Sequence, residues 1–348
     1  MYNYYLEFID IAVEISKRLP EYSSKFSKKD FTQRQLMTLY FLKQKSKLSY
    51  DDFIEDFSTR TSAIEDLCLK KLPSPSTLKM FVNRIDTNLL EQMIADCIQL
   101  TNQKIPLYLP TLKSVGLFGI LGCSEMLIHM LKHVVFAKHF WHKRRLNLAI
   151  DATEFQLEDG SYSYLKRLGL ATKKRKNLKL SGCADTDNHL FTAVKIRKSS
   201  RHDSIDYKSL IIKTKNNTGK QIKTSVGDKA YDDENLHEFA EENDFVHIAP
   251  LRKKTKQFHR IHGKHRKKLA RNFPEKKYHR RSIIENMWFC VKRLCGKVVF
   301  AKKWINQKKE LMGKVLAYNI HRLVRILRIW LSPNLGKDFK EHLSGHKK

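Results

Sequence analysis

Apolar residues recur every three or four positions through much of residues 1–110, a spacing that predicts helices rather than strands. The expected helices cover residues 2–17, 32–45, 50–57 and 76–85. Ser76 is the expected N-cap of the last helix, after a turn at residues 72–75. The apolar face of that helix would consist of Leu78, Phe81, Val82 and Ile85. We therefore expect an all-helical domain over residues 1–110, followed by a helical linker region over residues 111–145.

From residue 146 the apolar positions form short runs bounded by turn residues, which is typical of buried strands. Strands are expected at residues 146–150, 176–185, 189–198, 224–230 and 245–249. Asp151 directly follows the first strand, and Asp228 lies at the end of the fourth. Helices are expected at residues 204–213, 233–242 and 307–330. Asp232 is the expected N-cap of the second of these helices, and the third is expected to pack on the sheet.

The stretch YHRRSIIENMWFCVK, residues 278–292, combines a helical pattern with an ordered set of polar residues. Its apolar positions define the face that a core would cover: Ile284, Met287, Val291 and Leu294. At about 100° per residue, Arg281, Glu285 and Lys292 fall within about 40° of one another, with Trp288 beside them. The helix therefore presents one carboxylate between two cations. Such a stripe is either a solvated salt-bridge face or part of a functional site.

These residues resemble those of a known family, the DDE transposases of prokaryotic insertion sequences. The matching residues are Asp151 in AIDATEF, Asp228 in VGDKAYDD, and the set Tyr278, Arg281, Glu285 and Lys292. The family's YREK signature is Tyr, two residues, Arg, three residues, Glu, six residues, Lys, and the chain reproduces it in full. The resemblance extends over about residues 146–327. It departs after Asp151, where Ala-Thr-Glu replaces the Ser or Gly with Ser or Thr that is frequent in the family.

The resemblance implies an RNase H-like α/β fold over residues 146–332, a mixed sheet flanked by helices, with a basic tail at 333–348. The order of expected elements agrees, because three strands precede alternating helices and strands. In that fold the first and fourth strands are neighbours. Asp151 and Asp228 would then meet at the centre of the sheet, and the helix bearing Glu285 would cross over them.

The resemblance also implies how the site would act. Three carboxylates are hard oxygen ligands that suit two Mg²⁺ ions, or Mn²⁺ in their place, with Asp151 bridging both ions. Tyr278, Arg281 and Lys292 would hold DNA phosphates near the cut. Relatives often have a His-Asp pair before the expected helix at residue 204, where this chain has His202 in KSSRHDS, and His202 could approach the scissile phosphate. The alternative is that the adjacent aspartate simply caps that helix.

The charge of the chain points to a polyanionic partner. The formal net charge is +31, which predicts salt-dependent attraction to nucleic acid. Residues 1–110 contain 15 Lys and Arg against 14 Asp and Glu, whereas the remainder contains 52 against 22. Between residues 252 and 281, fourteen of thirty residues are Lys or Arg, and only Glu275 opposes them. This basic arm is either a solvated segment or, as we favour, an arm that orders on DNA phosphates.

The helix at 76–85 presents Lys79, Asn83 and Arg84 opposite its apolar face, and would suit the second helix of a helix-turn-helix that recognises DNA ends. A small helical bundle used only for packing or dimerisation fits the nearly neutral segment almost as well. The six cysteines form no CxxC pair or zinc-ligand spacing, so we expect buried, reduced thiols. The N-terminal residues lack a signal-peptide pattern, and the apolar stretch at residues 115–131 contains Glu125 and His129, which favours a core helix.

The combined expectation is a cytoplasmic, nucleoid-associated, Mg²⁺-dependent transposase that binds double-stranded DNA, assembles as a homo-oligomer on it, and does not enter membranes. It would cleave the ends of its element and transfer them to a target. Two alternatives stay open at this stage. One is an inactive or domesticated DNA-binding derivative, and the other is an RNase H-fold nuclease that hydrolyses DNA without joining it.

Overall fold

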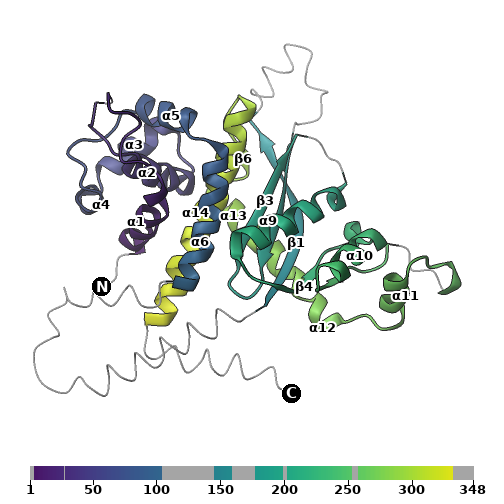
Figure 1. Ribbon diagram of the computed structural model, residues 1–348. Helices are drawn as coiled ribbons and strands as arrows, with labels where there is room; N and C mark the ends of the chain where they lie inside the picture. The colour runs from purple at the N-terminus through teal and green to yellow at the C-terminus, as the bar shows by residue number, and fades with distance from the viewer. Residues whose placement is uncertain are drawn as a thin grey trace, which may run out of the picture.

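The computed structural model describes residues 4–26, 28–103, 145–158, 177–198, 202–252 and 258–331. A layer of helices forms one end of the molecule, and a mixed sheet with its own helices forms the rest (Figure 1). The helical layer contains α1 (Tyr4–Ile15), η1 (Ser16–Arg18), α2 (Gln33–Ser46), α3 (Tyr50–Ser58), α4 (Thr61–Asp66), α5 (Pro75–Arg84) and α6 (Thr87–Gln103). The four helices expected here are confirmed as α1, α2, α3 and α5, while α4 and α6 were not anticipated.

Side-chain caps fix the beginnings of the helices in this layer. Thr32 caps α2 through a reciprocal capping box with Gln35. The prediction that Ser76 caps α5 is wrong, because the helix begins one residue earlier, at Pro75, and Ser74 accepts the N–H of Thr77. Proline suits the first helical position because its missing N–H would have no intrahelical partner there.

The sheet contains β1 (Leu146–Leu157), β2 (Asn177–Asp185), β3 (Leu190–Arg197), β4 (Ile222–Val226), β5 (Val246–Ile248) and β6 (Val298–Val299). The strand order is β3-β2-β1-β4-β5, and β6 pairs with β1. The pairs β1–β2 and β2–β3 are antiparallel, whereas β1–β4 and β4–β5 are parallel. The five expected strands are present, and β1 and β4 are neighbours as the resemblance implies. The prediction that the fourth strand carries Asp228 is wrong, because β4 ends at Val226 and Asp228 caps the following turn. The short β6 was not anticipated.

β1 is longer than its apolar run predicts. It does not end before Asp151 but continues to Leu157, because β2 pairs with it from Leu148 to Gln156 and β6 pairs with its last two residues. Cross-strand hydrogen bonds extend the strand through residues whose side chains are polar. Asp151 is therefore an internal residue of β1, at the level where the neighbouring β4 has already ended.

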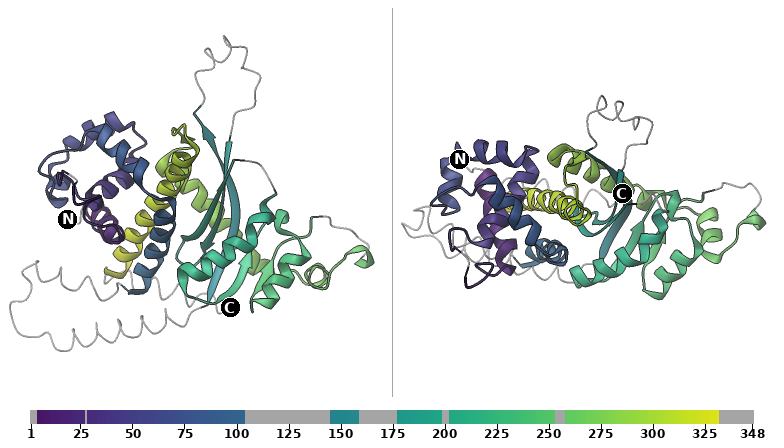
Figure 2. Two further views of the ribbon diagram at one scale, coloured as in Figure 1. Left: turned by 45° about the horizontal axis from the view of Figure 1, so that its top comes forward. Right: turned by 90° about the horizontal axis from the view of Figure 1, so that it is seen from above.

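Helices cover both faces of the sheet (Figure 2). They are η3 (Asp203–Asp206), α9 (Tyr207–Thr218), η4 (Lys229–Tyr231), α10 (Glu234–Glu242), η5 (Phe258–Arg260), α11 (Lys264–Arg271), α12 (Glu275–Tyr278), α13 (Arg281–Cys295) and α14 (Trp304–Leu331). One core joins the α9 and α10 face of the sheet to Leu146, Leu148 and Ile150 of β1. A second core joins the other face to α13, α14 and the N-terminal helices.

The C-terminal helix α14 packs on β3 as expected, and it also contacts α1, α2 and α6. Its buried Lys314 holds the end of α13 in place, since Nζ donates to the carbonyl oxygens of Cys295 at 2.7 Å and Val298 at 3.0 Å. Glu310, one turn earlier, accepts the N–H groups of Phe300 and Ala301. This long helix therefore connects the helical layer to the position of α13.

Several expectations fall on residues outside the described ranges: the helical linker at 111–145, the core helix at 115–131 and the basic tail at 333–348. Among the described cysteines, Cys97, Cys183 and Cys295 are buried and free, as expected. Cys68 and Cys290 are free but exposed, so the expectation of burial is wrong for these two. Within the part of the chain that the structure describes, no helix is both long and apolar enough to span a membrane.

Candidate active site

The alternation of side chains along β1 sets Asp151 on the face of the sheet that α13 covers. Leu148 and Ile150 belong to the α9 side of the sheet, whereas Ala149 and Phe155 belong to the core that contains α13. Because side chains alternate between faces, Asp151 shares the second face. In the parallel register, Ala149 pairs with Val226, so Asp151 lies at the level of residue 228 on the neighbouring chain segment.

The charges of the other two predicted acids both act on Asp151. The pKa of Asp151 is raised to about 7, mainly by burial and in addition by the nearby carboxylates of Asp228 and Glu285. The N–H of Ala152 and the guanidinium of Arg281 act in the opposite direction. Negative charge is therefore costly at Asp151, and an additional cation at this position would be stabilised.

Glu285 lies in the second turn of α13 and is paired with Arg281. The distance between Arg281 Nη1 and Glu285 Oε1 is 2.7 Å, and the Glu285 side chain is 47% exposed. The guanidinium carbon of Arg281 lies 5.9 Å from the centre of the Tyr278 ring. Tyr278 is the last residue of α12 and therefore precedes α13, so the four residues of the signature belong to two consecutive helices.

Lys292 reaches β1 from the far part of α13. Its Nζ donates to Thr153 Oγ1 at 2.6 Å and lies 5.5 Å from the centre of the Phe155 ring. Burial lowers the pKa of Lys292, and Lys297 lowers it further, while Glu154 and Asp151 oppose the effect. Arg281, at the beginning of α13, and Lys292, in its last turn, thus both bring a positive charge near Asp151.

Asp228 follows β4 and begins the short helix η4. Its Oδ1 accepts the N–H of Ala230 at 2.8 Å, which fixes the turn on which the carboxylate stands. Tyr231, which sequence reasoning did not select, is fully buried in this turn, and its hydroxyl has no hydrogen-bond partner among the described residues. Burial raises the pKa of Tyr231, as do Asp203, Asp151 and Asp228. The position of Tyr231 three residues after Asp228 was the only signal available in the sequence.

Trp288 is not part of the exposed stripe, so this part of the helical-face prediction is wrong. The side chain is 3% exposed, and its ring centre lies 4.3 Å from that of Phe191 on β3. It also lies against Gly182 of β2, where a Cβ atom would approach the Trp288 ring to 2.6 Å. Trp288 therefore determines how closely α13 approaches the sheet, and so supports the position of Glu285.

The remaining predicted site residues lie elsewhere or make other contacts. His202 is exposed, with no described contact to the three acids, while the adjacent Asp203 forms an ion pair with Lys179. Lys79 pairs with Asp51 at 3.4 Å. Arg84 donates to the carbonyl oxygen of Met80 at 3.3 Å. These last two residues belong to α5 in the helical layer, apart from the sheet.

One further prediction is wrong beside Asp228. The N-cap of α10 is Asp233, not Asp232, because Asp233 accepts the N–H of Asn235. Asp232 is buried and instead forms a two-point ion pair with Arg266, at 2.7 and 2.9 Å. The described part of the basic arm is accordingly an ordered element of the protein, α11, whose Arg266 is already paired with a carboxylate.

The donor set suits a hard divalent cation, although the described side chains do not form a closed ligand set. Asp151, Asp228 and Glu285 supply carboxylate oxygens, the preferred ligands of Mg²⁺. Among the residues in the described ranges, no three His, Cys, Asp or Glu side chains converge closely enough to hold a metal ion. Glu285 would have to leave Arg281 in order to join the two aspartates.

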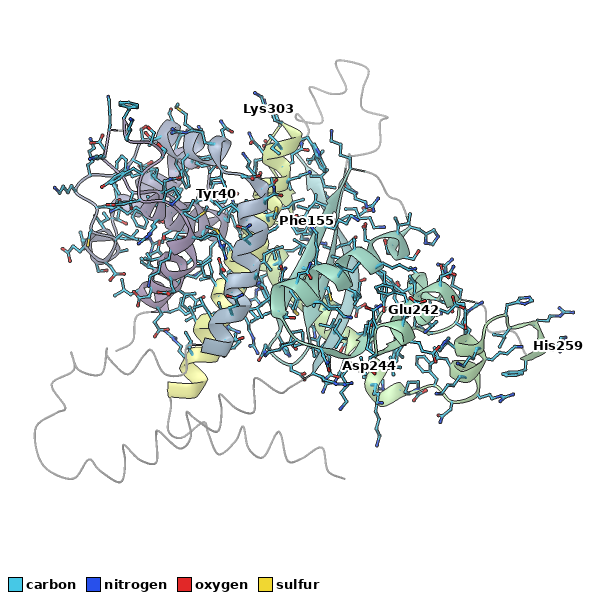
Figure 3. All side chains as sticks on the ribbon, in the orientation of Figure 1. Tyr40, Phe155, Glu242, Asp244, His259 and Lys303 are labelled. Carbon is cyan, nitrogen blue, oxygen red and sulfur yellow. The ribbon has the colours of Figure 1, made fainter. Side chains whose placement is uncertain are left out.

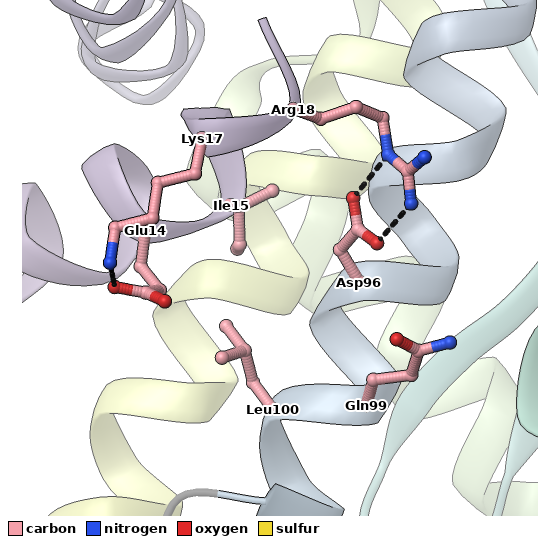
Figure 4. Close-up of a pocket in the computed structure, with 7 residues that line it drawn as sticks. All are labelled: Glu14, Ile15, Lys17, Arg18, Asp96, Gln99 and Leu100. Carbon is pink, nitrogen blue, oxygen red and sulfur yellow. Dashed lines mark hydrogen bonds and ion pairs between the residues drawn. The ribbon is translucent and has the colours of Figure 1, made fainter. Parts of the chain in front are cut away.

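A separate surface hollow of about 340 Å³ lies between α1, η1 and α6. Figure 4 shows that the Arg18–Asp96 ion pair closes one side of it, with Glu14, Lys17 and Gln99 around the rest. None of the predicted site residues lies on these elements. The hollow therefore belongs to the helical layer and not to the acidic site.

A mixed sheet with one aspartate inside β1 and a second just after the neighbouring strand β4, beside a helix that bears a glutamate, defines the class of DDE-type nucleic-acid-cleaving domains. A family model described as a transposase DDE domain matches residues 142–320. The chain belongs to this family.

Among solved structures, the chain is similar to the piggyBac transposase in its synaptic complex with hairpin DNA. The TM-score is 0.38 at 10% sequence identity, covering 99% of this chain and 85% of that one. A similarity at this level supports no conclusion about function. No curated protein matches the chain.

Proposed function

We propose that the protein is a Mg²⁺-dependent transposase that cleaves DNA at the ends of an insertion sequence and transfers those ends to a target. The observation that carries this proposal is that the charges of Asp228 and Glu285 both act on Asp151, which lies on the face of the sheet that α13 covers, in a chain of the DDE family. The proposed partner is double-stranded DNA, both as element ends and as target. Assembly would be as a homo-oligomer on DNA, in the cytoplasm.

Asp151, Asp228 and Glu285 would hold the metal. When bound, two Mg²⁺ ions activate the attacking oxygen and stabilise the leaving oxygen of an in-line displacement. Water would attack first, and the 3′ hydroxyl that it releases would attack the target strand second. Neither step requires a nucleophile from the protein, which agrees with a site built from carboxylates and cations.

The ion pair between Arg281 and Glu285 gives the cations a defined role. Ionised Asp151 and Glu285 would turn toward the metal, and the guanidinium of Arg281 would then be free to form a two-point contact with a backbone phosphate. Lys292, held by Thr153, would supply a second positive charge on the same face of β1. Tyr278 would contact the backbone beside Arg281.

The test is cleavage of duplexes that carry the DNA flanking the gene, with Mg²⁺ or Mn²⁺ present. Asp151→Asn, Asp228→Asn and Glu285→Gln should each reduce cleavage by about 100-fold or more, while DNA binding stays close to wild type. Glu154→Gln is the matched control, since this exposed residue lies on the same strand and carries the same charge. Its activity should be nearly normal.

Full activity in any one acid variant would remove that residue from the site. The products separate the remaining possibilities. Joining of cleaved ends to a second duplex identifies a transposase, whereas hydrolysis without joining identifies a nuclease. Sequence-specific binding without either reaction identifies a DNA-binding derivative.

A further inference from the structure

The helix α11 lies at the opposite end of the molecule from α1 to α5 in each of the views (Figures 1 and 2). It belongs to the segment between β5 and α12, and in Figure 3 this segment reaches its tip near His259. Six of the fourteen residues from 258 to 271 are Lys or Arg, and none is Asp or Glu. The like charges of this helix repel one another, so contacts with other residues are needed to stabilise its position.

Acidic side chains of the α10 region form a clasp that fixes α11. The Glu234 carboxylate accepts two N–H groups at the beginning of α11, those of His265 at 2.8 Å and Arg266 at 3.1 Å. Asp232, buried beside it, binds the Arg266 guanidinium at two points. We call Asp232 and Glu234 the clasp.

Two further contacts on the same side of α11 support the clasp. His265 Nε2 lies 3.2 Å from a carboxylate oxygen of Glu241. The His265 ring also stacks on that of His237, at 5.8 Å and 11° between planes. Gly263, with φ of 96°, precedes the helix at a point where a Cβ atom would overlap the Glu234 carboxylate. The local sequence is therefore adapted to bring this helix onto α10.

The clasp leaves the opposite side of α11 uncovered. At about 100° per residue, the half-buried His265, Arg266 and Leu269 fall within about 100° of one another and form the face toward α10. Lys267, Lys268 and Arg271 also fall within about 100° of one another, centred about 150° from the first group. All three are exposed, and none has a carboxylate partner in the described ranges. We call these three cations the α11 basic face.

We propose that the α11 basic face binds the sugar-phosphate backbone of duplex DNA, and that the clasp holds this face in position before DNA arrives. The proposal rests on the proposed function, which supplies DNA as the partner. It adds a surface that lies apart from the three acids and from α5. Three cations on one side of a short helix match a row of phosphates, and the guanidinium of Arg271 is already positioned 4.6 Å from the centre of the Phe258 ring. A helix that is already ordered also loses less entropy on binding.

The first experiment measures the affinity of the full-length protein for a random-sequence duplex as a function of salt concentration. Replacing Lys267, Lys268 and Arg271 together by Gln should reduce the slope of log affinity against log salt by about two to three. The matched control replaces Lys25, Lys28 and Lys29 by Gln, which removes the same charge from exposed positions in the helical layer. The control should leave the slope nearly unchanged.

The second experiment tests the clasp with a variant for which simple electrostatics predicts the opposite change in DNA affinity. Glu234→Ala removes a negative charge, which by itself should strengthen DNA binding. If the clasp orders α11, the variant should instead bind more weakly, by up to about 30-fold, the factor that corresponds to a lost helix N-cap. Hydrogen exchange at the amides of His265 and Arg266 should accelerate. Glu242→Ala, an exposed acid on the same helix, is the matched control and should bind at least as well as wild type.

The outcomes separate this proposal from the function on which it rests. An unchanged salt slope in the triple α11 variant overturns the basic face, even if Asp151→Asn still abolishes cleavage and the proposed function stands. Affinity of Glu234→Ala equal to that of Glu242→Ala overturns the role of the clasp. A wild-type protein that neither binds nor cleaves duplex DNA would instead refute the proposed function itself.

Discussion

Replacing Asp151 by Asn should stabilise the metal-free protein by an amount that depends on pH. Burial, followed by the carboxylates of Asp228 and Glu285, raises the pKa of Asp151 from 3.8 to about 7. A raised pKa means that the folded state prefers the protonated acid, so ionisation opposes folding. At about 1.4 kcal/mol per pH unit, full ionisation costs the folded state about 4 kcal/mol. Asn has a similar shape and does not ionise.

The pH window follows from the same two values. Below pH 3.8 the carboxyl group is protonated in both the folded and the unfolded state, so ionisation contributes nothing. Between pH 3.8 and about 7 the folded state holds a proton that the unfolded state has lost, and wild-type stability falls as the pH rises. Above about pH 7 the cost is complete and constant.

The assay is urea or thermal unfolding of wild type, Asp151→Asn and the control Glu154→Gln in the presence of a chelator. The advantage of Asp151→Asn over wild type should grow by about 2 kcal/mol between about pH 5 and pH 7, or several degrees in Tm. A difference between the two proteins that stays constant over this range would refute the reasoning. Adding Mg²⁺ near pH 8 should stabilise wild type more than the variant, because a divalent ion offsets the charge of the ionised group.

The other predictions concern the helix that bears Glu285. Trp288→Ala should destabilise the protein by about 3 to 5 kcal/mol, because a buried ring on β2 and β3 is lost. Phe289→Ala, at a side chain that is 64% exposed, should change the free energy of unfolding by less than about 0.5 kcal/mol in the same denaturation experiment. Arg281→Ala and Lys292→Ala should each lower the salt slope of DNA binding by about one while calorimetric Mg²⁺ binding persists. A cleavage defect with unchanged DNA affinity and salt slope would instead make the two cations partners of Glu285 alone.

The order of the helices and strands, and the order of the three acids, could be predicted from the sequence. Helical and strand periodicity are local properties, so the helices at residues 32–45 and 50–57 and the strands at 176–185 and 189–198 could be placed without knowledge of their partners. The spacing from Tyr278 to Lys292 is equally local. For these reasons the mixed sheet flanked by helices, with a helical region before it, could be predicted.

Tertiary structure decided the properties that depend on a partner element. β1 continues past Asp151 because β2 supplies hydrogen bonds, and this places the carboxylate inside a strand under α13. Trp288 lies at the border between the polar stripe and the apolar face of α13, and the Phe191 ring decides that it is buried. The angular position of a residue on its helix does not show whether a side chain of a neighbouring element covers it.

The basic segment that contains α11 also has some properties that its sequence determines and others that only the fold determines. Its composition determined that it would carry many positive charges, and its sequence gave no indication of which of them are already paired. Asp232 and Glu234 precede β5 in the sequence, more than twenty residues before α11, and they bind one face of α11. The cations on its other face have no carboxylate partner among the described residues. Charge is fixed by the sequence because it is additive along the chain. Which cations remain available to a ligand is a property of the fold, because it depends on the carboxylates that the fold brings within hydrogen-bond distance.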